Sequence, residues 1–372
     1  MKNKMQIGVI FGGRSGEHEV SLRSAHFIIS MLSPEKYDVT CIGITKDGRW
    51  LSGENVLNAF ETGKTDGLWP VTILPEPGNN TLYAIKHSEG RAVLEAQTRL
   101  DVVFPVLHGT FGEDGTLQGL LEMAGLAYAG AGVLGSAVGM DKALFKDVLR
   151  SHNLPVADSV IANIFDVRER LPELLDEAEK MGTYPLFVKP ANMGSSVGIT
   201  KCRSRSDLME GVMDAIRFDR RILIEQGINA REIEVSVMGN ENPQVSLPGE
   251  IRPKADFYTY AAKYLDDTSE LVIPADLDLE TTQFIQQVAL QVYKAIDCAG
   301  LARVDFLMDK DNGQLFVNEV NTMPGFTSIS MYPKLWEASG ISSQELVNRL
   351  IELALERKTV RDGLEYQYGS EA

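Results

Sequence analysis

The alternation of apolar and polar residues predicts that the chain begins as a parallel α/β sheet. Residues 5–11 form a nearly continuous apolar run with β-branched members, which is typical of a strand buried on both faces. An amphipathic stretch over 19–32 predicts a helix, and residues 37–45 predict the next strand. Residues 100–107 predict a further buried strand, followed by a helix that ends at Met123. This order places the loop after the first strand where open α/β sheets bind ligands.

The next part of the chain contains an insertion and then a domain boundary. Pro, Gly and Asn recur over residues 46–98, which indicates loops and hairpins inserted in the first domain. A second domain is predicted to begin after Gly139, because Asp141 suits the N-cap of a helix over residues 142–151. Lys142 then lies at the positive end of the helix dipole, which is unfavourable unless an anion such as a nucleotide phosphate lies nearby.

The second half of the chain predicts antiparallel strand pairs instead. Residues 184–202 have the pattern of a strand, a glycine-rich turn and a second strand. Residues 221–226 and 231–238 predict two more strands. Amphipathic helices are expected over 279–299 and over 344–357, the latter with a leucine stripe typical of a core.

A predicted β-hairpin over residues 302–321 has a polar face that needs an explanation. Folding the chain about residue 312 sets Arg303 opposite Asn321 and sets Asp305 opposite Glu319. Side chains alternate along a strand, so one face gathers a cation, two carboxylates and an amide.

The other face of this hairpin is predicted to be a core face, formed by Val304, Phe306, Phe316 and Val320. Partly buried carboxylates need a partner, and oxygen ligands at this spacing suit a hard cation such as Mg²⁺. A solvated polar face is the alternative, and the hairpin alone leaves both interpretations open.

Composition narrows the classes of protein. A length of 372 residues allows two or three domains, and a formal net charge of −16 argues against nucleic acid or an anionic membrane as the main partner. A small anionic ligand remains possible. The three cysteines (Cys41, Cys202 and Cys298) are far apart and indicate a reducing compartment. Without a signal peptide or a bilayer-spanning segment in the pattern, we expect a cytoplasmic protein.

Three glycine-rich loops follow predicted strands and are candidate ligand loops. Glu17 follows the first loop; a helix-dipole partner is the favoured interpretation, and a cleft-facing ligand for a cation is the alternative. His108 begins the loop HGTFGEDGTLQG, where a ligand-facing role is favoured over that of a loop histidine. Lys189 precedes the tip Gly194-Ser195-Ser196, whose backbone N–H groups can cradle phosphates.

Two short motifs suggest other classes of enzyme. GAGVLG over residues 130–135 matches a dinucleotide fingerprint, but it follows only a short apolar run and no acidic strand end follows at the required distance. GSSVG matches the nucleophile elbow of hydrolases, which requires a histidine after the serine; all five histidines precede Ser196. A dinucleotide-dependent oxidoreductase therefore remains a weak alternative, together with a non-catalytic nucleotide-binding module.

Eight motifs in order carry a resemblance that covers most of the chain: GGRSGEHEVSL, HGTFGEDGTLQG, GMDK, VKPANMGSSVG, EQGINAREIEV, AKYLDD, ARVDF and NEVNTMPGFTS. With these motifs the chain resembles the D-alanine–D-alanine ligases of the ATP-grasp superfamily. The resemblance implies an α/β (α+β) fold of three domains, with nucleotide bound between two antiparallel sheets. The implied domains are a parallel-sheet domain (1–139), a central ATP-grasp subdomain (140–228) and a C-terminal ATP-grasp subdomain (229–372).

The resemblance also implies a nucleotide site. The residues implied to bind ATP are Lys142, Lys189, Ser195, Ser196, Glu225, Gln226, Ile228, Glu232 and Lys263. Gln226 is a departure from the family pattern, because some members carry lysine at this hinge position. The implied metal ligands are Asp305, Glu319 and Asn321, for two Mg²⁺ ions or for Mn²⁺.

The resemblance further implies two amino-acid subsites. Glu17 corresponds to the acid that binds the ammonium group of the first D-alanine, and it is linked to Tyr264 through Ser195, with His108 nearby. Arg303 and the backbone of Gly325 face the developing oxyanion, and Ser330 and Met331 match positions that hold the second carboxylate. The implied catalytic residues are thus Glu17, Ser195, Tyr264, Arg303 and Ser330.

The implied reaction is ATP-dependent ligation of two D-alanines through a D-alanyl phosphate, which supplies a peptidoglycan precursor. Tyr264 favours an amine nucleophile, because relatives that make D-alanyl-D-lactate tend to carry phenylalanine or another loop there. D-serine is the alternative second substrate. The family also implies a homodimer, and neither nucleic acid nor a membrane is an expected partner.

Overall fold

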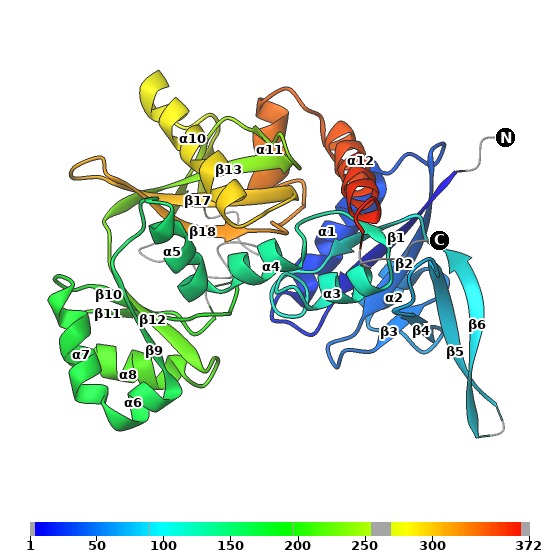
Figure 1. Cartoon of the computed structure of the whole chain (residues 1–372), viewed down its shortest axis with the longest axis horizontal. Helices are drawn as coiled ribbons and strands as arrows, with labels where there is room; N and C mark the ends of the chain where they lie inside the picture. Colours follow the sequence, from blue (N-terminus) through cyan, green and yellow to red (C-terminus); the bar gives the residue numbers. More distant parts are fainter. Residues whose placement is uncertain (1–3, 89, 196, 254–268, 366–372) are drawn as a thin grey trace.

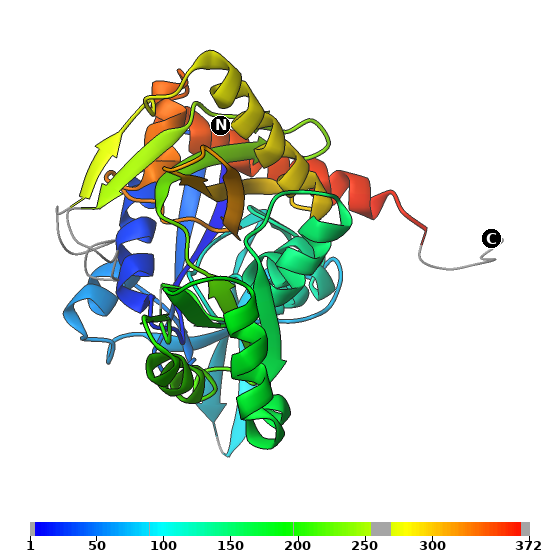
Figure 2. The ribbon, with the colours of Figure 1, turned by 90° about the vertical axis from the view of Figure 1, so that its left-hand side faces the viewer.

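The computed structural model describes residues 4–88, 90–195, 197–253 and 269–365, which build three β-sheets with helices around them (Figure 1). The six-stranded sheet lies above the four-stranded sheet in both perpendicular views (Figure 1 and Figure 2), and the eight-stranded sheet lies beside them. Within the described residues no helix is long and apolar enough to cross a membrane.

The eight-stranded sheet comes from the amino-terminal part and has the order β6-β5-β4-β3-β2-β1-β7-β8. Its parallel half contains β1 (Met5–Gly12), β2 (Tyr37–Ile44), β7 (Val102–Val106) and β8 (Ala127–Tyr128). The antiparallel half contains β3 (Trp50–Ser52), β4 (Trp69–Ile73), β5 (Thr81–Ser88) and β6 (Arg91–Arg99). The predicted strands and the predicted parallel pairing of the first two are confirmed, and the inserted segment forms hairpins as expected.

Helices from both ends of the chain cover this sheet. They are α1 (His18–Met31), α2 (Val56–Thr62), α3 (Thr116–Met123) and α12 (Ser343–Asp362). Buried residues of β1, α1 and β7 share one apolar core with residues of α12, so the carboxyl-terminal helix belongs to the core of the amino-terminal sheet. The sequence did not predict α2, and α12 continues beyond the predicted end at residue 357.

The four-stranded sheet has the order β11-β10-β12-β9 and is antiparallel. Its strands are β9 (Ser159–Asn163), β10 (Leu186–Pro190), β11 (Thr200–Cys202) and β12 (Arg221–Gln226), and its helices are α6 (Ile164–Glu169), α7 (Leu171–Lys180) and α8 (Arg205–Ala215). The helices bury one face of the sheet. The other face is left for α5 and for a cavity described below.

The six-stranded sheet is also antiparallel, with β16-β15-β13-β17-β18 in order and β14 paired to β13. Its strands are β13 (Ala230–Gly239), β14 (Gln244–Val245), β15 (Gly249–Pro253), β16 (Ser269–Val272), β17 (Gly300–Asp309) and β18 (Leu315–Asn321). The accompanying helices are α4 (Val133–Met140), α5 (Lys142–Ser151), α10 (Leu279–Ala295) and α11 (Met331–Ala338). The α10 helix ends at Ala295, four residues before the predicted end; Ile296 is its C-cap residue, and left-handed Asp297 (φ 54°) comes next.

The hairpin of β17 and β18 has the predicted cross-strand residue pairs, but its apolar core face differs from the prediction at one residue. Arg303 lies opposite Asn321 and Asp305 lies opposite Glu319, as expected. Beyond this point a bulge shifts the register, so that Phe306 pairs with Val317. Val317 is therefore fully buried, and the prediction that Phe316 belongs to the core face is wrong: Phe316 lines a cavity instead.

Candidate active site

Two cavities meet at the centre of the molecule. The inter-sheet cavity (1140 Å³) lies between the four-stranded and the six-stranded sheets. The amino-terminal cavity (700 Å³) lies between the loops of the eight-stranded sheet and the β17–β18 hairpin. Four residues line both cavities: Lys142, Ser195, Ile251 and Glu319. Molecules bound in the two cavities would therefore lie next to each other at this junction.

The inter-sheet cavity brings together most of the predicted nucleotide residues. Its walls include Lys142, Lys189, Ser195, Glu225, Gln226, Ile228 and Glu232. The Asp141 side chain accepts a hydrogen bond from the backbone of Leu144 at 2.9 Å, which confirms the predicted N-cap. The Lys142 ammonium donates to the carbonyl of Met193 at 2.8 Å and lies 3.8 Å from the Glu319 carboxylate.

The amino-terminal cavity brings together the predicted amino-acid subsites. It is lined by Glu17, Ser195, Arg303, Gly325, Ser330 and Met331, together with others. The Ser195 hydroxyl donates to the Glu17 carboxylate. A Cβ on Gly109 or on Gly194 would come within 2.7 Å of that carboxylate, so glycine at both positions lets the backbone close around it.

The position of Glu17 resolves the two interpretations of its sequence context. Glu17 is the N-cap residue of α1, yet its side chain makes no capping hydrogen bond. The side chain is buried and faces the amino-terminal cavity. The cleft-facing alternative therefore describes this residue better than the helix-dipole interpretation that the sequence favoured.

His108 lies behind the cavity wall instead of facing a ligand. Its Nδ1 pairs with the carbonyl of Met323 at 2.9 Å, and its Nε2 pairs with the Ser24 hydroxyl at 3.0 Å. Burial lowers the pKa of His108, which favours the neutral ring. The histidine thus joins the first domain to the loop after β18, and direct contact with a substrate would require it to change partners.

The polar face of the hairpin is held together by ion pairs. Arg303 makes two contacts of 2.7 Å with the carboxylate of Asp305. The Asn321 amide donates to the same carboxylate at 3.0 Å. Burial of Asp305 and its place beside Arg303 exclude a simple solvated face.

These hairpin residues fit a magnesium site. Asp305, Glu319 and Asn321 offer two carboxylates and one amide oxygen, the hard donors that Mg²⁺ prefers. Among the described residues no group of three or more His, Cys, Asp or Glu side chains could hold a metal. An ion here would thus complete its shell with water and phosphate oxygens, which is the usual habit of Mg²⁺ at nucleotides.

One wall of the amino-terminal cavity is formed by the start of α11. The Ser330 hydroxyl accepts a hydrogen bond from the Thr327 backbone at 3.0 Å and contacts the Thr327 hydroxyl at 2.7 Å. Ser330 is the N-cap residue of α11 and its side chain makes no capping bond to the helix. The positive end of the helix dipole at this position suits a carboxylate.

Four buried charged residues in or near the site were not predicted as site residues from the sequence: Glu113, Lys146, Glu234 and Glu250. Glu113 accepts from the backbone of Gly109 at 2.7 Å and of Met323 at 3.1 Å. Burial and then the nearby Glu17 raise the pKa of Glu113 to about 8.

The sequence carried a signal for two of these residues. Glu234 lies directly opposite Asp305 in the β13–β17 ladder and 2.9 Å from Arg303, and the alternation of β13 already gave it the polar face. Lys146 is one helical turn after Lys142, so the two lysines share a face of α5. Glu113 had no comparable signal, because its loop has no periodic pattern.

Ser196, Lys263 and Tyr264 lie outside the described residues. Their roles rest on the sequence motifs alone.

Comparison with known proteins identifies the family. The model for the D-ala D-ala ligase N-terminus matches residues 6–131, and the model for the D-ala D-ala ligase C-terminus matches residues 148–352. A D-alanine–D-alanine ligase of Natranaerobius thermophilus is 47% identical over 96% of this chain and 97% of its own length. A D-alanine–D-alanine ligase B of Clostridium tetani is 46% identical over 95% of each chain.

Solved structures agree with this assignment. The D-alanine–D-alanine ligase of Coxiella burnetii has a TM-score of 0.80 at 38% identity, covering 96% of each chain. The VanG D-Ala:D-Ser ligase of Enterococcus faecalis has a TM-score of 0.82 at 34% identity, covering 95% of this chain and all of its own. The chain belongs to the D-alanine–D-alanine ligase family and has its ATP-grasp fold.

Proposed function

We propose that this protein joins two D-alanines to D-alanyl-D-alanine with ATP, through a D-alanyl phosphate, and so supplies a peptidoglycan precursor. The observation that carries the proposal is the junction of the two cavities at Lys142, Ser195 and Glu319. A nucleotide in the inter-sheet cavity would present its terminal phosphate there to an amino acid in the amino-terminal cavity. A non-catalytic nucleotide-binding module has no need of the second cavity.

In the first step an oxygen of the D-alanine carboxylate attacks the γ-phosphorus of ATP, and the bond to the ADP oxygen breaks. Both reactants are anions, so their approach needs cations at the junction. Lys142 and Lys189 are placed to supply positive charge from one side. Glu17 would hold the ammonium group of the amino acid, and the hydrogen bond from Ser195 would fix the orientation of the Glu17 carboxylate. His108 would act near this substrate through the loop that it anchors.

In the second step the amine of the second D-alanine attacks the acyl carbon, the amine loses a proton, and phosphate leaves. The tetrahedral intermediate carries negative charge on oxygen, which Arg303 and the backbone of Gly325, both in the lining of the amino-terminal cavity, would stabilise. Ser330 and Met331 would hold the second carboxylate at the start of α11. Lys263 and Tyr264 are assigned to the closing loop by the family motifs alone.

The adenine would lie against Glu225, Gln226 and Ile228, with Glu232 at the ribose. We assign Asp305, Glu319 and Asn321 to two Mg²⁺ ions, which Mn²⁺ could replace. When bound, such ions neutralise phosphate charge and orient the transferred group. The three domains 1–139, 140–228 and 229–372, a homodimer and a cytoplasmic location complete the proposal on the strength of the family resemblance.

The proposal is tested by identifying the product. Purified protein is incubated with ATP, Mg²⁺ and equal concentrations of D-alanine, D-serine and D-lactate, and the products are separated by mass spectrometry. We expect D-alanyl-D-alanine to dominate, with stoichiometric ADP and phosphate. Dominant D-alanyl-D-serine or D-alanyl-D-lactate would overturn the substrate assignment. ADP release without any dipeptide or depsipeptide would overturn the ligase assignment, and an absorbance change with NAD(P)H would favour an oxidoreductase.

A further inference from the structure

Lys146 is a buried lysine in the wall of the inter-sheet cavity that has no role in the steps above. Its side chain is only 2% exposed, which is rare for lysine. Its ammonium lies 2.5 Å from Oε1 of Glu225. The other oxygen of Glu225 forms an ion pair with Lys189. Two lysines from two elements, α5 and β10, thus share one carboxylate on β12.

The three side chains form a charged group with one excess positive charge. Burial alone would raise the pKa of Glu225, but Lys189 and Lys146 outweigh it and lower this pKa to about 2. Burial lowers the pKa of Lys146, while the pairing with Glu225 opposes that shift. Glu225 therefore stays ionised at neutral pH, and at least one lysine must remain beside it to offset the cost of burying its charge.

The two lysines differ in what they can do when a nucleotide enters. On the proposed function, Lys189 binds phosphate and Glu225 binds adenine, although in this structure the two side chains bind each other. Lys189 must therefore release Oε2 of Glu225 as it turns to the phosphates. The exocyclic amino group of adenine can then donate to the oxygen that Lys189 has left. Lys146, enclosed by the protein, stays on Oε1.

We propose that Lys146 is a positioning residue for the nucleotide base, which holds Glu225 oriented and charged while Lys189 exchanges Glu225 for the phosphates. This inference rests on the proposed function. It assigns adenine selectivity to the pair of Lys146 and Glu225. Hypoxanthine carries a carbonyl where adenine has its amino group, so it would place an acceptor against the Glu225 carboxylate. The protein should accordingly prefer ADP to IDP.

The test measures the binding of ADP and IDP by calorimetry, with Mg²⁺ present. A hydrogen bond to a charged group corresponds to roughly 10- to 100-fold in affinity, and we expect a preference for ADP of this order. Lys146→Met should reduce the ratio of the affinity for ADP to the affinity for IDP about tenfold. Lys146→Arg should keep this affinity ratio within about threefold of the wild-type value, because the charge remains. A purely structural lysine would lower the affinity for both nucleotides equally, and that result would overturn the proposal.

Two further measurements keep the inference falsifiable if Lys146→Met is unstable. The single variant Glu225→Gln should lose the preference for ADP over IDP. The double variant Lys146→Met with Glu225→Gln should show no further loss in the ratio of the two affinities. Additive losses would show that Lys146 does not act through Glu225. If the wild-type protein makes the dipeptide from ATP but binds ADP and IDP with equal affinity, this inference is overturned and the ligase function stays intact. Absence of both synthesis and ADP binding would instead overturn the proposed function.

Discussion

The guanidinium group of Arg303 and the carboxylate of Asp305 form a two-point ion pair, with both nitrogen–oxygen distances at 2.7 Å. Their proposed roles separate them, since Asp305 is assigned to the metal and Arg303 to the oxyanion. Glu234 lies 2.9 Å from the same guanidinium group and is buried. Glu234 can therefore hold Arg303 in place when Asp305 binds an ion.

This arrangement predicts a specific effect of Glu234→Gln. The variant keeps the shape of the side chain but loses the charge that orients Arg303. We expect kcat to fall roughly 10- to 100-fold, while KM for ATP changes less than about threefold. Steady-state kinetics with a coupled ADP assay measures both. Glu232→Gln is the matched control on the same strand and should mainly raise KM for ATP. Equal effects of the two variants on KM for ATP would contradict the role of Glu234.

Glu319→Gln tests the metal assignment. Loss of one of two carboxylates weakens the attraction for a divalent cation, so the Mg²⁺ concentration for half-maximal activity should rise at least about tenfold. Turnover at saturating Mg²⁺ should also fall. Magnesium titrations of D-alanine-dependent phosphate release measure both quantities. Glu280→Gln, on the exposed start of α10, serves as control. An unchanged magnesium requirement in Glu319→Gln would remove Glu319 from the ligand set.

Glu113 predicts that stability depends on pH in the neutral range. Its pKa is raised to about 8 in the folded protein, whereas an exposed glutamate titrates near 4.5. The folded state then retains a proton that the unfolded state releases, so the free energy of unfolding decreases as the pH rises from about 4.5 to 8. In the Glu113→Gln variant the free energy of unfolding should therefore fall less over this pH range, by about 1–4 kcal/mol.

Urea unfolding at pH 5, 6.5 and 8 measures this effect as the difference between wild type and variant. Glu173→Gln, an exposed change in the first turn of α7, is the control and should follow the wild type. A Glu113→Gln protein whose stability falls with pH as steeply as the wild type would show that Glu113 is ionised throughout.

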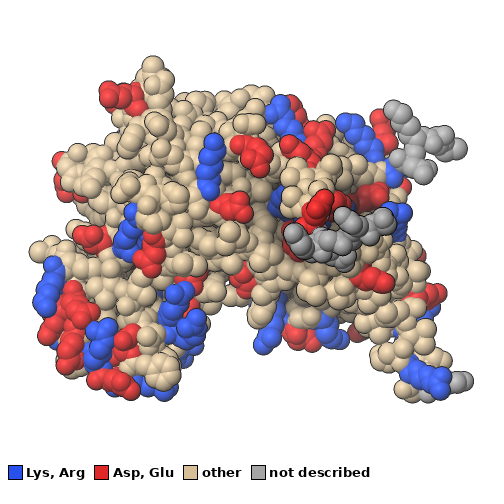
Figure 3. Space-filling view, in the orientation of Figure 1, with Lys and Arg blue, Asp and Glu red and all other residues tan. Residues whose placement is uncertain are grey.

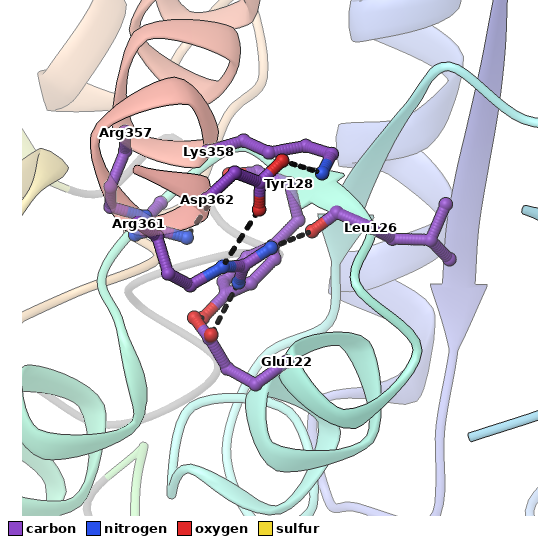
Figure 4. A network of polar contacts seen from close by, with 8 residues as sticks. Glu122, Leu126, Tyr128, Arg357, Lys358, Arg361 and Asp362 are labelled. Carbon is purple, nitrogen blue, oxygen red and sulfur yellow. Dashed lines mark hydrogen bonds and ion pairs between the residues drawn. The ribbon is translucent and has the colours of Figure 1, made fainter. Parts of the chain in front are cut away.

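The carboxyl-terminal helix predicts a stability effect far from the cavities. The guanidinium group of Arg357 lies 4.1 Å from the centre of the Tyr128 ring, and Arg361 pairs with Glu122 (Figure 4). Both arginines also donate to carbonyl oxygens in and beside the edge strand β8, those of Leu126, Tyr128 and Gly130. These contacts fasten α12 to the sheet of the amino-terminal domain and cover an unpaired strand edge.

Arg357→Ala should lower the free energy of unfolding by about 1–3 kcal/mol, through lost cation–π contact and unsatisfied carbonyl groups. Arg349→Ala is the control on the same helix, where an exposed pair with Glu345 contributes about 0.5 kcal/mol or less. Chemical denaturation compares the two variants. A smaller loss for Arg357→Ala than for Arg349→Ala would contradict the fastening role.

The net charge of the whole protein says little about the charge of the ligand that it binds. On the face in Figure 3, basic and acidic side chains are interspersed over the described residues despite the net charge of −16. The lysines that matter, Lys142 and Lys189, line the inter-sheet cavity and are largely buried. A strongly acidic protein can therefore still offer individual lysine side chains to an anionic nucleotide.

The sequence by itself determined the elements and the local pairs. Buried apolar runs predicted the parallel strands, and strand parity placed Arg303 and Asp305 on one face of the hairpin, because these patterns depend on neighbours along the chain. The motifs determined the family, which the comparisons confirm.

Only the tertiary structure decided which distant residues meet. The bulge in the hairpin moved Phe316 out of the core, and no periodicity in the sequence indicates a bulge. The orientation of Glu17 depends on Ser195, 178 residues later, and Lys146 of α5 pairs with Glu225 on strand β12. Such contacts arise when separate elements pack together, so the free energy of burying each charge depends on side chains that local sequence does not specify.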